Sequence, residues 1–121
     1  MQVEKVNLAQ KFGLFDDFWA PKIVAELNGQ AVKLAKLQGE FIWHHHDVED
    51  ELFLVVKGRL LIQFRDRDVL LEEGDLIVVP AGVEHRPVAE EEAHVLLFEP
   101  KTTLNTGNVQ DERTVTEVER I

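Results

Sequence analysis

Short runs of strand-forming residues follow one another along most of the chain, and each run ends at a glycine, a proline or a group of charged residues. The Asn28-Gly29 pair between the first two runs predicts a tight hairpin. The runs predict strands over Ile23–Leu27, Gln30–Leu37, Glu40–His46, Glu51–Lys57, Arg59–Phe64, Val69–Glu72, Asp75–Val79, Glu84–Ala89 and His94–Glu99. Many short strands at close, regular spacing predict an all-β sandwich or barrel.

The first residues follow a helical pattern instead. Leu8, Phe12 and Phe15 recur at helical spacing after Asn7, a residue type that favours the start of a helix. Gly13 interrupts this pattern, so the predicted helix is short.

The C-terminal residues are polar and rich in threonine. We expect them either to pack over the β-structure or to be partly disordered, because they are too long for a simple connection. The sequence therefore predicts one domain over residues 1–121, with a helical segment over 1–20, a β-barrel over 21–100 and a tail over 101–121.

The predicted strand over residues 51–57 is hydrophobic on both faces. Leu52, Leu54 and Val56 share one face, whereas Phe53 and Val55 share the other with Glu51. A barrel interior can cover only one of the two faces. The other face exposes a hydrophobic stripe unless a terminal segment or a second subunit lies on it.

Composition excludes several kinds of chemistry. The chain has no cysteine, which excludes thiol catalysis, cysteine-ligated zinc, iron–sulfur clusters and disulfide frameworks. Serine and tyrosine are also absent, so neither a serine nucleophile nor a tyrosine general acid is available. The sequence contains no phosphate-binding loop, dinucleotide-binding fingerprint or zinc-protease motif.

The formal net charge of the 121 residues is −10 at pH 7. So acidic a surface repels nucleic-acid phosphates and anionic membranes, and we expect neither as a partner. No run of about 18 hydrophobic residues is present, and the N-terminus lacks the pattern of a signal peptide. We therefore expect a cytoplasmic protein.

Three consecutive histidines, His44, His45 and His46, stand at the end of one predicted strand. Alternation along a strand sends His44 and His46 to the same face, close enough to ligate one metal ion. A hairpin to the next predicted strand would bring Glu51 beside them. His85, which follows a predicted turn, is a fourth candidate ligand.

Three imidazoles and one carboxylate suit a divalent first-row metal and leave coordination positions open. From residue types alone, a solvated polar turn explains the histidines equally well. Glu49 competes with Glu51 as the carboxylate because it has the same strand parity. We expect His45 to face away from the site and His94 to be a surface or partly buried residue.

Two spaced motifs resemble those of the cupin superfamily. The first is Gly39-x4-His44-x-His46-x4-Glu51-x6-Gly58, and the second is Gly74-x5-Pro80-x-Gly82-x2-His85. Fifteen residues separate the motifs, which is similar to the spacing in small bacterial cupins. The first motif is one residue shorter than is common in the family, and Ala89 stands where the second often has asparagine.

The resemblance implies a jelly-roll β-barrel of the kind often related to mannose-6-phosphate isomerase. It implies that His44, His46, Glu51 and His85 hold one divalent metal ion, either Fe, Mn, Ni or Zn. It also implies a homodimer, since cupins usually pair two barrels. The interface would be isologous.

Two classes of function fit these expectations. One is a metal-dependent enzyme, of isomerase or oxygenase type, that acts on a small molecule in the barrel pocket; the other is a non-catalytic metal-containing binding protein. An isomerase acting on a sugar phosphate would need basic side chains in the pocket. Candidates for binding an anion are Arg59, Arg65, Arg67 and Arg86, and candidates for lining the pocket are Ile42, Phe53, Val78 and Phe98.

Overall fold

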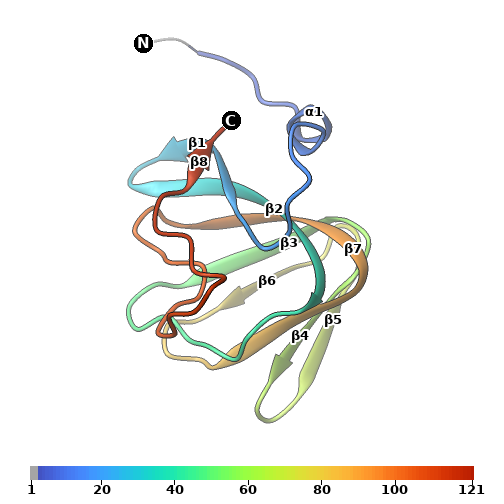
Figure 1. Cartoon of the computed structure of the whole chain (residues 1–121), viewed down its shortest axis with the longest axis vertical. Helices are drawn as coiled ribbons and strands as arrows, with labels where there is room; N and C mark the ends of the chain where they lie inside the picture. Colours follow the sequence, from blue (N-terminus) through green and yellow to red (C-terminus); the bar gives the residue numbers. More distant parts are fainter. Residues whose placement is uncertain (1–2) are drawn as a thin grey trace.

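The structure, a computed structural model, describes residues 3–121 (Figure 1). Its elements, in chain order, are the helix α1 (Leu8–Phe12) and the strands β1 (Lys22–Leu27), β2 (Gln30–Glu40), β3 (Glu51–Lys57), β4 (Leu60–Phe64), β5 (Asp68–Leu71), β6 (Leu76–Val79), β7 (His85–Pro100) and β8 (Glu119–Arg120). No helix in this part of the chain is long and hydrophobic enough to cross a membrane. The cytoplasmic location stays a prediction.

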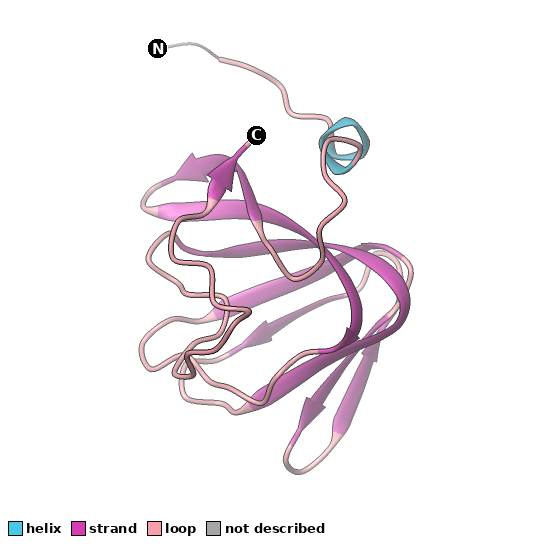
Figure 2. Ribbon diagram, viewed as in Figure 1, coloured by secondary structure: helices cyan, strands magenta, loops and turns pink. Residues whose placement is uncertain are grey.

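The long strand β7 organises the β-structure. It pairs antiparallel with β2 along one edge, and with β4 and then β3 along the other. β5 extends from β4, β1 extends from β2, and β6 pairs with β3. The two longest strands, β2 and β7, bend around the interior (Figures 1 and 2). The fold is the predicted all-β jelly roll with a short N-terminal helix.

The hairpin predicted at Asn28-Gly29 is confirmed. Leu27 and Gln30 pair across the turn, and Asn28 and Gly29 both have positive φ, at 52° and 78°. A two-residue turn of this kind matches the twist of the flanking strands and favours Asn-Gly.

Two of the predicted strand boundaries are wrong. Apart from Glu84, the segments Glu84–Ala89 and His94–Glu99 belong to the single strand β7, and the acidic residues 90–92 lie exposed within it. The pairing of β2 with β7 shifts register at this point. The acidic residues therefore form an irregularity in the ladder, where their side chains reach water without ending the strand.

The segment Glu40–His46 is also not a strand. β2 runs on through Gly39, which takes a φ of 86° at the register shift, and ends at Glu40. Residues 41–46 form a loop that meets β7 through an isolated bridge between His44 and His85. Glycine tolerates this backbone conformation, so the strand continues through Gly39 instead of ending there as the sequence predicted.

The barrel interior holds the main hydrophobic core. Inward-facing positions alternate with half-buried or exposed ones, as in β3, where Phe53 and Val55 are buried while Leu52 and Leu54 are half-buried. The core comprises Ala35, Leu37, Phe53, Val55, Leu60, Ile62, Leu71, Val79, Ala89, Ala93, Val95 and Leu97. This alternation is the parity predicted from the sequence.

α1 covers part of the outer face of the sheet. Asn7 caps the helix by accepting a hydrogen bond from the Gln10 backbone N–H at 2.9 Å. Phe12 and Phe15 then pack against Leu34, with Val56 at the edge of this second hydrophobic cluster. The N-terminal segment therefore shields one end of the predicted hydrophobic stripe.

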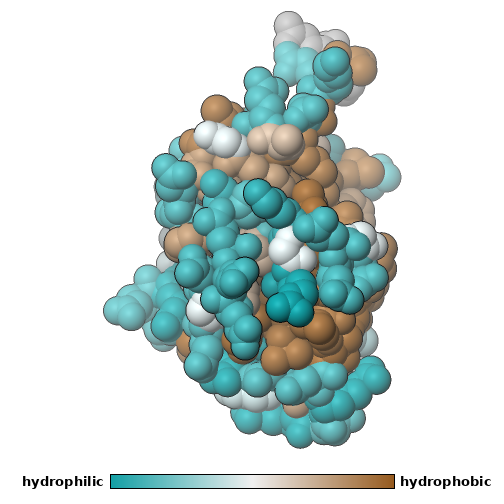
Figure 3. Space-filling model, turned by 90° about the vertical axis from the view of Figure 1, so that its right-hand side faces the viewer, coloured by the Kyte–Doolittle hydropathy of each residue, from teal (hydrophilic) through white to brown (hydrophobic). Residues whose placement is uncertain are grey.

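The rest of that outer face is less covered. Leu52 and Leu54 are half-buried, and they pair in the sheet with Val78 and Leu76, which are 50% and 58% exposed. On the face of the molecule drawn in Figure 3, hydrophobic surface lies open among polar side chains. Hydrophobic side chains therefore remain in contact with water in the single chain.

The C-terminal tail packs along the barrel, which is the first of the two arrangements expected from the sequence. Thr103 and Thr106 are buried, and β8 pairs in parallel with β1. Asn108 exchanges two hydrogen bonds with the backbone of His45, at 2.8 and 2.9 Å. The tail is thus fixed next to the histidine loop.

Candidate functional site

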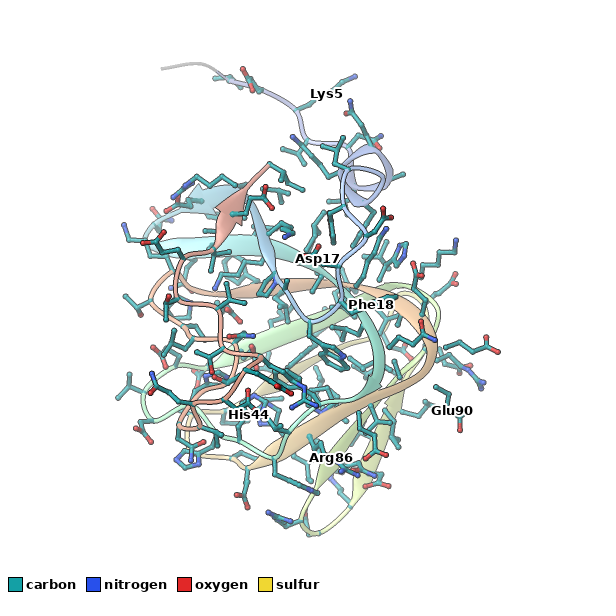
Figure 4. The ribbon with its side chains drawn as sticks, viewed as in Figure 1. Lys5, Asp17, Phe18, His44, Arg86 and Glu90 are labelled. Atoms are coloured by element: carbon teal, nitrogen blue, oxygen red, sulfur yellow. The ribbon has the colours of Figure 1, made fainter. Side chains whose placement is uncertain are left out.

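Four buried side chains converge inside the barrel. His44 and His46 come from the loop after β2, Glu51 from the start of β3, and His85 from the start of β7. One potential ligand atom from each lies within 4.8 Å of those of the other three. Figure 4 shows His44 inside the molecule close to the tail. This group could hold a metal ion.

Backbone hydrogen bonds fix the loop that carries the histidines. His44 and His85 exchange two of them, at 3.0 and 2.9 Å. The Gly82 N–H donates to the His46 carbonyl at 2.7 Å, and the Asp50 carboxylate accepts from the Ala81 N–H at 2.9 Å. The turn before β7 therefore holds the loop after β2, and the four side chains converge although residues 41–46 are not a strand.

Hydrogen bonds to backbone carbonyls orient two of the imidazoles. Nδ1 of His44 lies 2.9 Å from the Ile42 carbonyl, and Nδ1 of His85 lies 2.9 Å from the Val83 carbonyl. A ring nitrogen that bonds to a carbonyl must carry the hydrogen. In the neutral rings Nε2 therefore keeps its lone pair, as a metal ligand requires.

Several polar atoms of the group are buried without a hydrogen-bond partner. They include Nε2 of His46, Nε2 of His85 and Oε1 of Glu51. Glu51 Oε1 lies 3.3 Å from His46 Nε2 and 3.5 Å from His85 Nε2. Buried polar atoms without partners destabilise a fold. A divalent cation bound by all three would satisfy them, so the residues present fit a metal ion.

Burial sets the ionisation of the group. Burial, with the neighbouring His85, lowers the pKa of His44 to about 4. Burial alone would raise the pKa of Glu51, but the neighbouring imidazoles of His46 and His85 bring it well below its usual value. At neutral pH the site therefore offers a neutral His44 imidazole and a negatively charged carboxylate, which is the form in which both bind metals.

A small cavity of about 40 Å³ lies beside His44 and Glu51. Its walls are mostly hydrophobic, and they are formed by Trp19, Pro21, Ala35, Leu37, Phe41, Phe53, Pro87, Val95 and Leu97, with Glu99 and Asn105 as further polar residues. Of the predicted lining residues only Phe53 contributes. Val78 is exposed, while Ile42 and Phe98 are half-buried outside the cavity, because their strand or loop positions direct them away from it.

The competing ligand candidates lie outside the group. Glu49 accepts a hydrogen bond from Thr102 at 3.3 Å. His45 pairs with the exposed Asp47 at 2.9 Å, and His94 is half-buried with its ring stacked on Phe12. These positions agree with what the sequence predicted for both histidines.

None of the four candidate arginines lines the cavity. Arg65 stacks over the Trp43 ring at 3.7 Å and bonds to Glu84, and Arg86 pairs with Glu40. Arg59 and Arg67 are exposed. The guanidinium groups therefore do not offer a phosphate site next to the four converging side chains.

Sequence reasoning missed a buried ion pair beside the site. Lys33 on β2 and Glu99 on β7 are 1% and 2% exposed, and their charged atoms lie 2.7 Å apart. Both lie at inward-facing positions of their strands, where the neighbouring inward-facing residues are hydrophobic. In the sequence, a charged residue at an inward-facing strand position could have indicated a buried ion pair. Which residue is its partner follows only from the pairing of β2 with β7.

Comparison with known proteins places these features in a family. Residues 31–109 match the family model described as "Cupin domain". The crystal structure of a cupin-2 domain containing protein from Shewanella frigidimarina is similar, with a TM-score of 0.78 and 45% sequence identity. That likeness covers 79% of this chain and 94% of the other.

Two curated relatives match about half of this chain. The uncharacterized protein YdbB of Bacillus subtilis is 44% identical over 64 residues, which are 52% of this chain and 57% of the relative. An acireductone dioxygenase of Pseudomonas fluorescens is 39% identical over 66 residues, which are 51% of this chain and 36% of that protein. The chain thus spans only part of the length of these relatives.

Proposed function

The chain belongs to the cupin family, and on this premise we propose that it is a metal-dependent enzyme of oxygenase type acting on a small molecule. His44, His46, Glu51 and His85 hold one divalent transition metal ion. The observation that carries the proposal is the set of buried nitrogen and oxygen atoms that lack hydrogen-bond partners and face one another.

The metal ion, when bound, supplies Lewis-acid or O₂-activating chemistry next to the cavity. The chain's own residues shape the cavity and orient the metal ligands. The hydrophobic walls, including Phe41 and Phe53, exclude water from it. The carbonyls of Ile42 and Val83 hold two imidazoles in the ligating orientation. Three imidazoles and a carboxylate accept Fe, Mn, Ni or Zn.

Two observations favour an oxygenase over an isomerase of sugar phosphates. The similarity to an acireductone dioxygenase extends over half of the chain. The basic groups that a phosphate would need are absent from the cavity walls, because the arginines lie elsewhere and Lys33 is already paired with Glu99. The second candidate function is a metal-containing protein that binds a small molecule without converting it. The small cavity is compatible with this function as well.

Elemental analysis of protein purified without added metal tests the proposal first. We expect about one equivalent of a first-row transition metal per chain. Folded protein that contains no such metal, and takes up none on dialysis, contradicts the proposal. O₂ consumption over a panel of small hydroxyketones, enediols and phenols then separates the two candidates. Binding of a panel member without O₂ consumption or conversion favours the binding protein.

A further inference from the structure

The ion pair of Lys33 and Glu99 lies inside the barrel next to the proposed metal site. Lys33 Nζ lies 2.7 Å from Glu99 Oε2 and 3.3 Å from the Thr103 carbonyl, so the tail also holds it. Desolvating two charges is costly, and a buried pair of this kind is often less stabilising than hydrophobic residues of the same volume. Its position therefore calls for a role other than stability.

Glu99 is the residue of the pair that reaches the cavity. It lines the cavity wall together with Glu51. Its Oε2 is occupied by Lys33, whereas Oε1 is buried and has no hydrogen-bond partner. With Glu51 engaged by a metal ion, Oε1 is a polar atom in a mostly hydrophobic pocket that still lacks a partner.

We propose that Glu99 Oε1 recognises a hydroxyl group of the ligand, next to the ligand oxygen that binds the metal. This inference rests on the proposed metal site and specifies the chemical class of its ligand. A hydroxyl group both donates and accepts a hydrogen bond, so it suits Glu99 in either protonation state. Lys33 is a positioning residue that holds the carboxyl group at the cavity wall.

The cavity limits the rest of the ligand. About 40 Å³ holds the equivalent of a few water molecules, so only a small head group enters. The wall residues other than His44, Glu51, Glu99 and Asn105 are hydrophobic, so the described wall offers no further charged group. The ligand class is therefore a small molecule whose head carries two neighbouring oxygens, at least one of them a hydroxyl, as in a hydroxyketone.

Ligand-observed NMR on the zinc-loaded protein tests this inference. The probe is hydroxyacetone, and the control is butan-2-one, which has a methyl group in place of the hydroxyl and the same size. We expect hydroxyacetone to bind about tenfold more tightly, as expected for one hydrogen bond to a buried carboxyl group. Equal affinities for the two probes overturn the inference while leaving the metal site intact. Failure to load zinc at all contradicts the proposed function instead.

The double variant Lys33→Met/Glu99→Met removes both charges and keeps the volume. We expect it to bind zinc and to lose the preference for hydroxyacetone. Lys36→Met is the matched control, because Lys36 is also a buried lysine of β2 but bonds to the Phe15 carbonyl outside the cavity, and it should keep the preference.

If the double variant does not fold, Glu99→Val decides in its place. It removes both carboxyl oxygens and leaves Lys33 bonded to the Thr103 carbonyl, so the preference for hydroxyacetone should be lost. An unchanged preference in either folded Glu99 variant overturns the inference.

Discussion

His85 is the residue on which the candidate site depends most directly. Its side chain is fully buried at the start of β7, and its Nε2 lacks a hydrogen-bond partner near Glu51. We expect His85→Ala to reduce bound metal by at least about tenfold, since it removes one of four ligands. Elemental analysis of the purified variant measures this.

His45→Ala is the matched control for that loss. His45 is adjacent to two of the proposed ligands, but its ring pairs with Asp47 at the surface. Its metal content should equal that of the unaltered protein. Equal metal loss in the two variants would mean that the histidine loop as a whole, rather than His85 as a ligand, determines binding.

The burial of His44 predicts how stability of the metal-free protein changes with pH. The pKa of this imidazole is lowered from 6.5 to about 4 by burial and by His85. The unfolded chain takes up the proton near pH 6.5, whereas the folded chain does so only near pH 4. The free energy of unfolding therefore falls as the pH drops through this window, by on the order of 3 kcal/mol from His44.

Urea unfolding in the presence of a chelator, at a series of pH values, measures this dependence. Glu51, whose pKa is lowered, adds a loss in the same direction below its usual value of 4.5. His44→Gln should flatten the curve between about pH 6.5 and pH 4. A curve as steep as that of the unaltered protein would show that His44 is not the group responsible.

The four converging residues were predictable because two spaced motifs of the sequence resemble those of the cupin superfamily, whereas residue types alone left a solvated polar turn equally possible. The reasoning from strand parity was nevertheless wrong for residues 41–46, which form a loop. Glu99 was not found, because a single acidic residue in a hydrophobic strand has no nearby sequence partner. Lys33 and Glu99 meet only through the pairing of β2 with β7, which residue spacing does not specify.

Strand boundaries, like the pairing of Lys33 with Glu99, depend on contacts between segments that are distant in the sequence. Glycine and acidic residues predicted the ends of strands, and they did so correctly at Asn28-Gly29. They failed at Gly39 and at residues 90–92, where two long strands continue through a register shift. Local residue preferences describe a tight hairpin completely, whereas the continuity of a long bent strand is decided by the neighbours it pairs with.

The tail is the element whose position can be tested most sharply. Gly107 has a φ of 57°, and a Cβ there would collide with the His45 carbonyl and stand 3.1 Å from Cδ2 of His44. We expect Gly107→Ala to displace the tail and to lower the free energy of unfolding by about 2 kcal/mol or more. It should also weaken metal binding, because the tail supports the loop of His44.

Gly74→Ala separates this collision from backbone strain alone. Gly74 also has a positive φ, 88°, but a Cβ there meets no atom within 4 Å. It should cost only the strain of the left-handed conformation, about 1 kcal/mol, and leave metal binding unchanged. Thermal unfolding and metal titration of the two variants give the comparison. Equal effects on metal binding would mean that the tail does not support the site.

At the scale of the whole molecule, the outer face of β3 and β6 remains to be covered. α1 and its cluster reach Val56 and Leu96 but leave Leu76 and Val78 about half exposed beside Leu52 and Leu54. Hydrophobic side chains gathered on one exposed sheet face favour an interaction site there. The net charge of −10 opposes association of two chains but does not forbid it, since charge can lie away from a hydrophobic contact.

We therefore predict a homodimer formed through this face. Light scattering at micromolar concentration should give twice the chain mass of 13.9 kDa. Val78→Glu places a charge in the face and should shift the protein to the single-chain mass, because an unpaired charge in a hydrophobic interface is costly. Leu70→Glu is the control: Leu70 is 50% exposed, like Val78, but lies on β5, away from β3 and β6. A single-chain mass for the unaltered protein, or equal dissociation by both variants, would mean that this face is not where two chains meet.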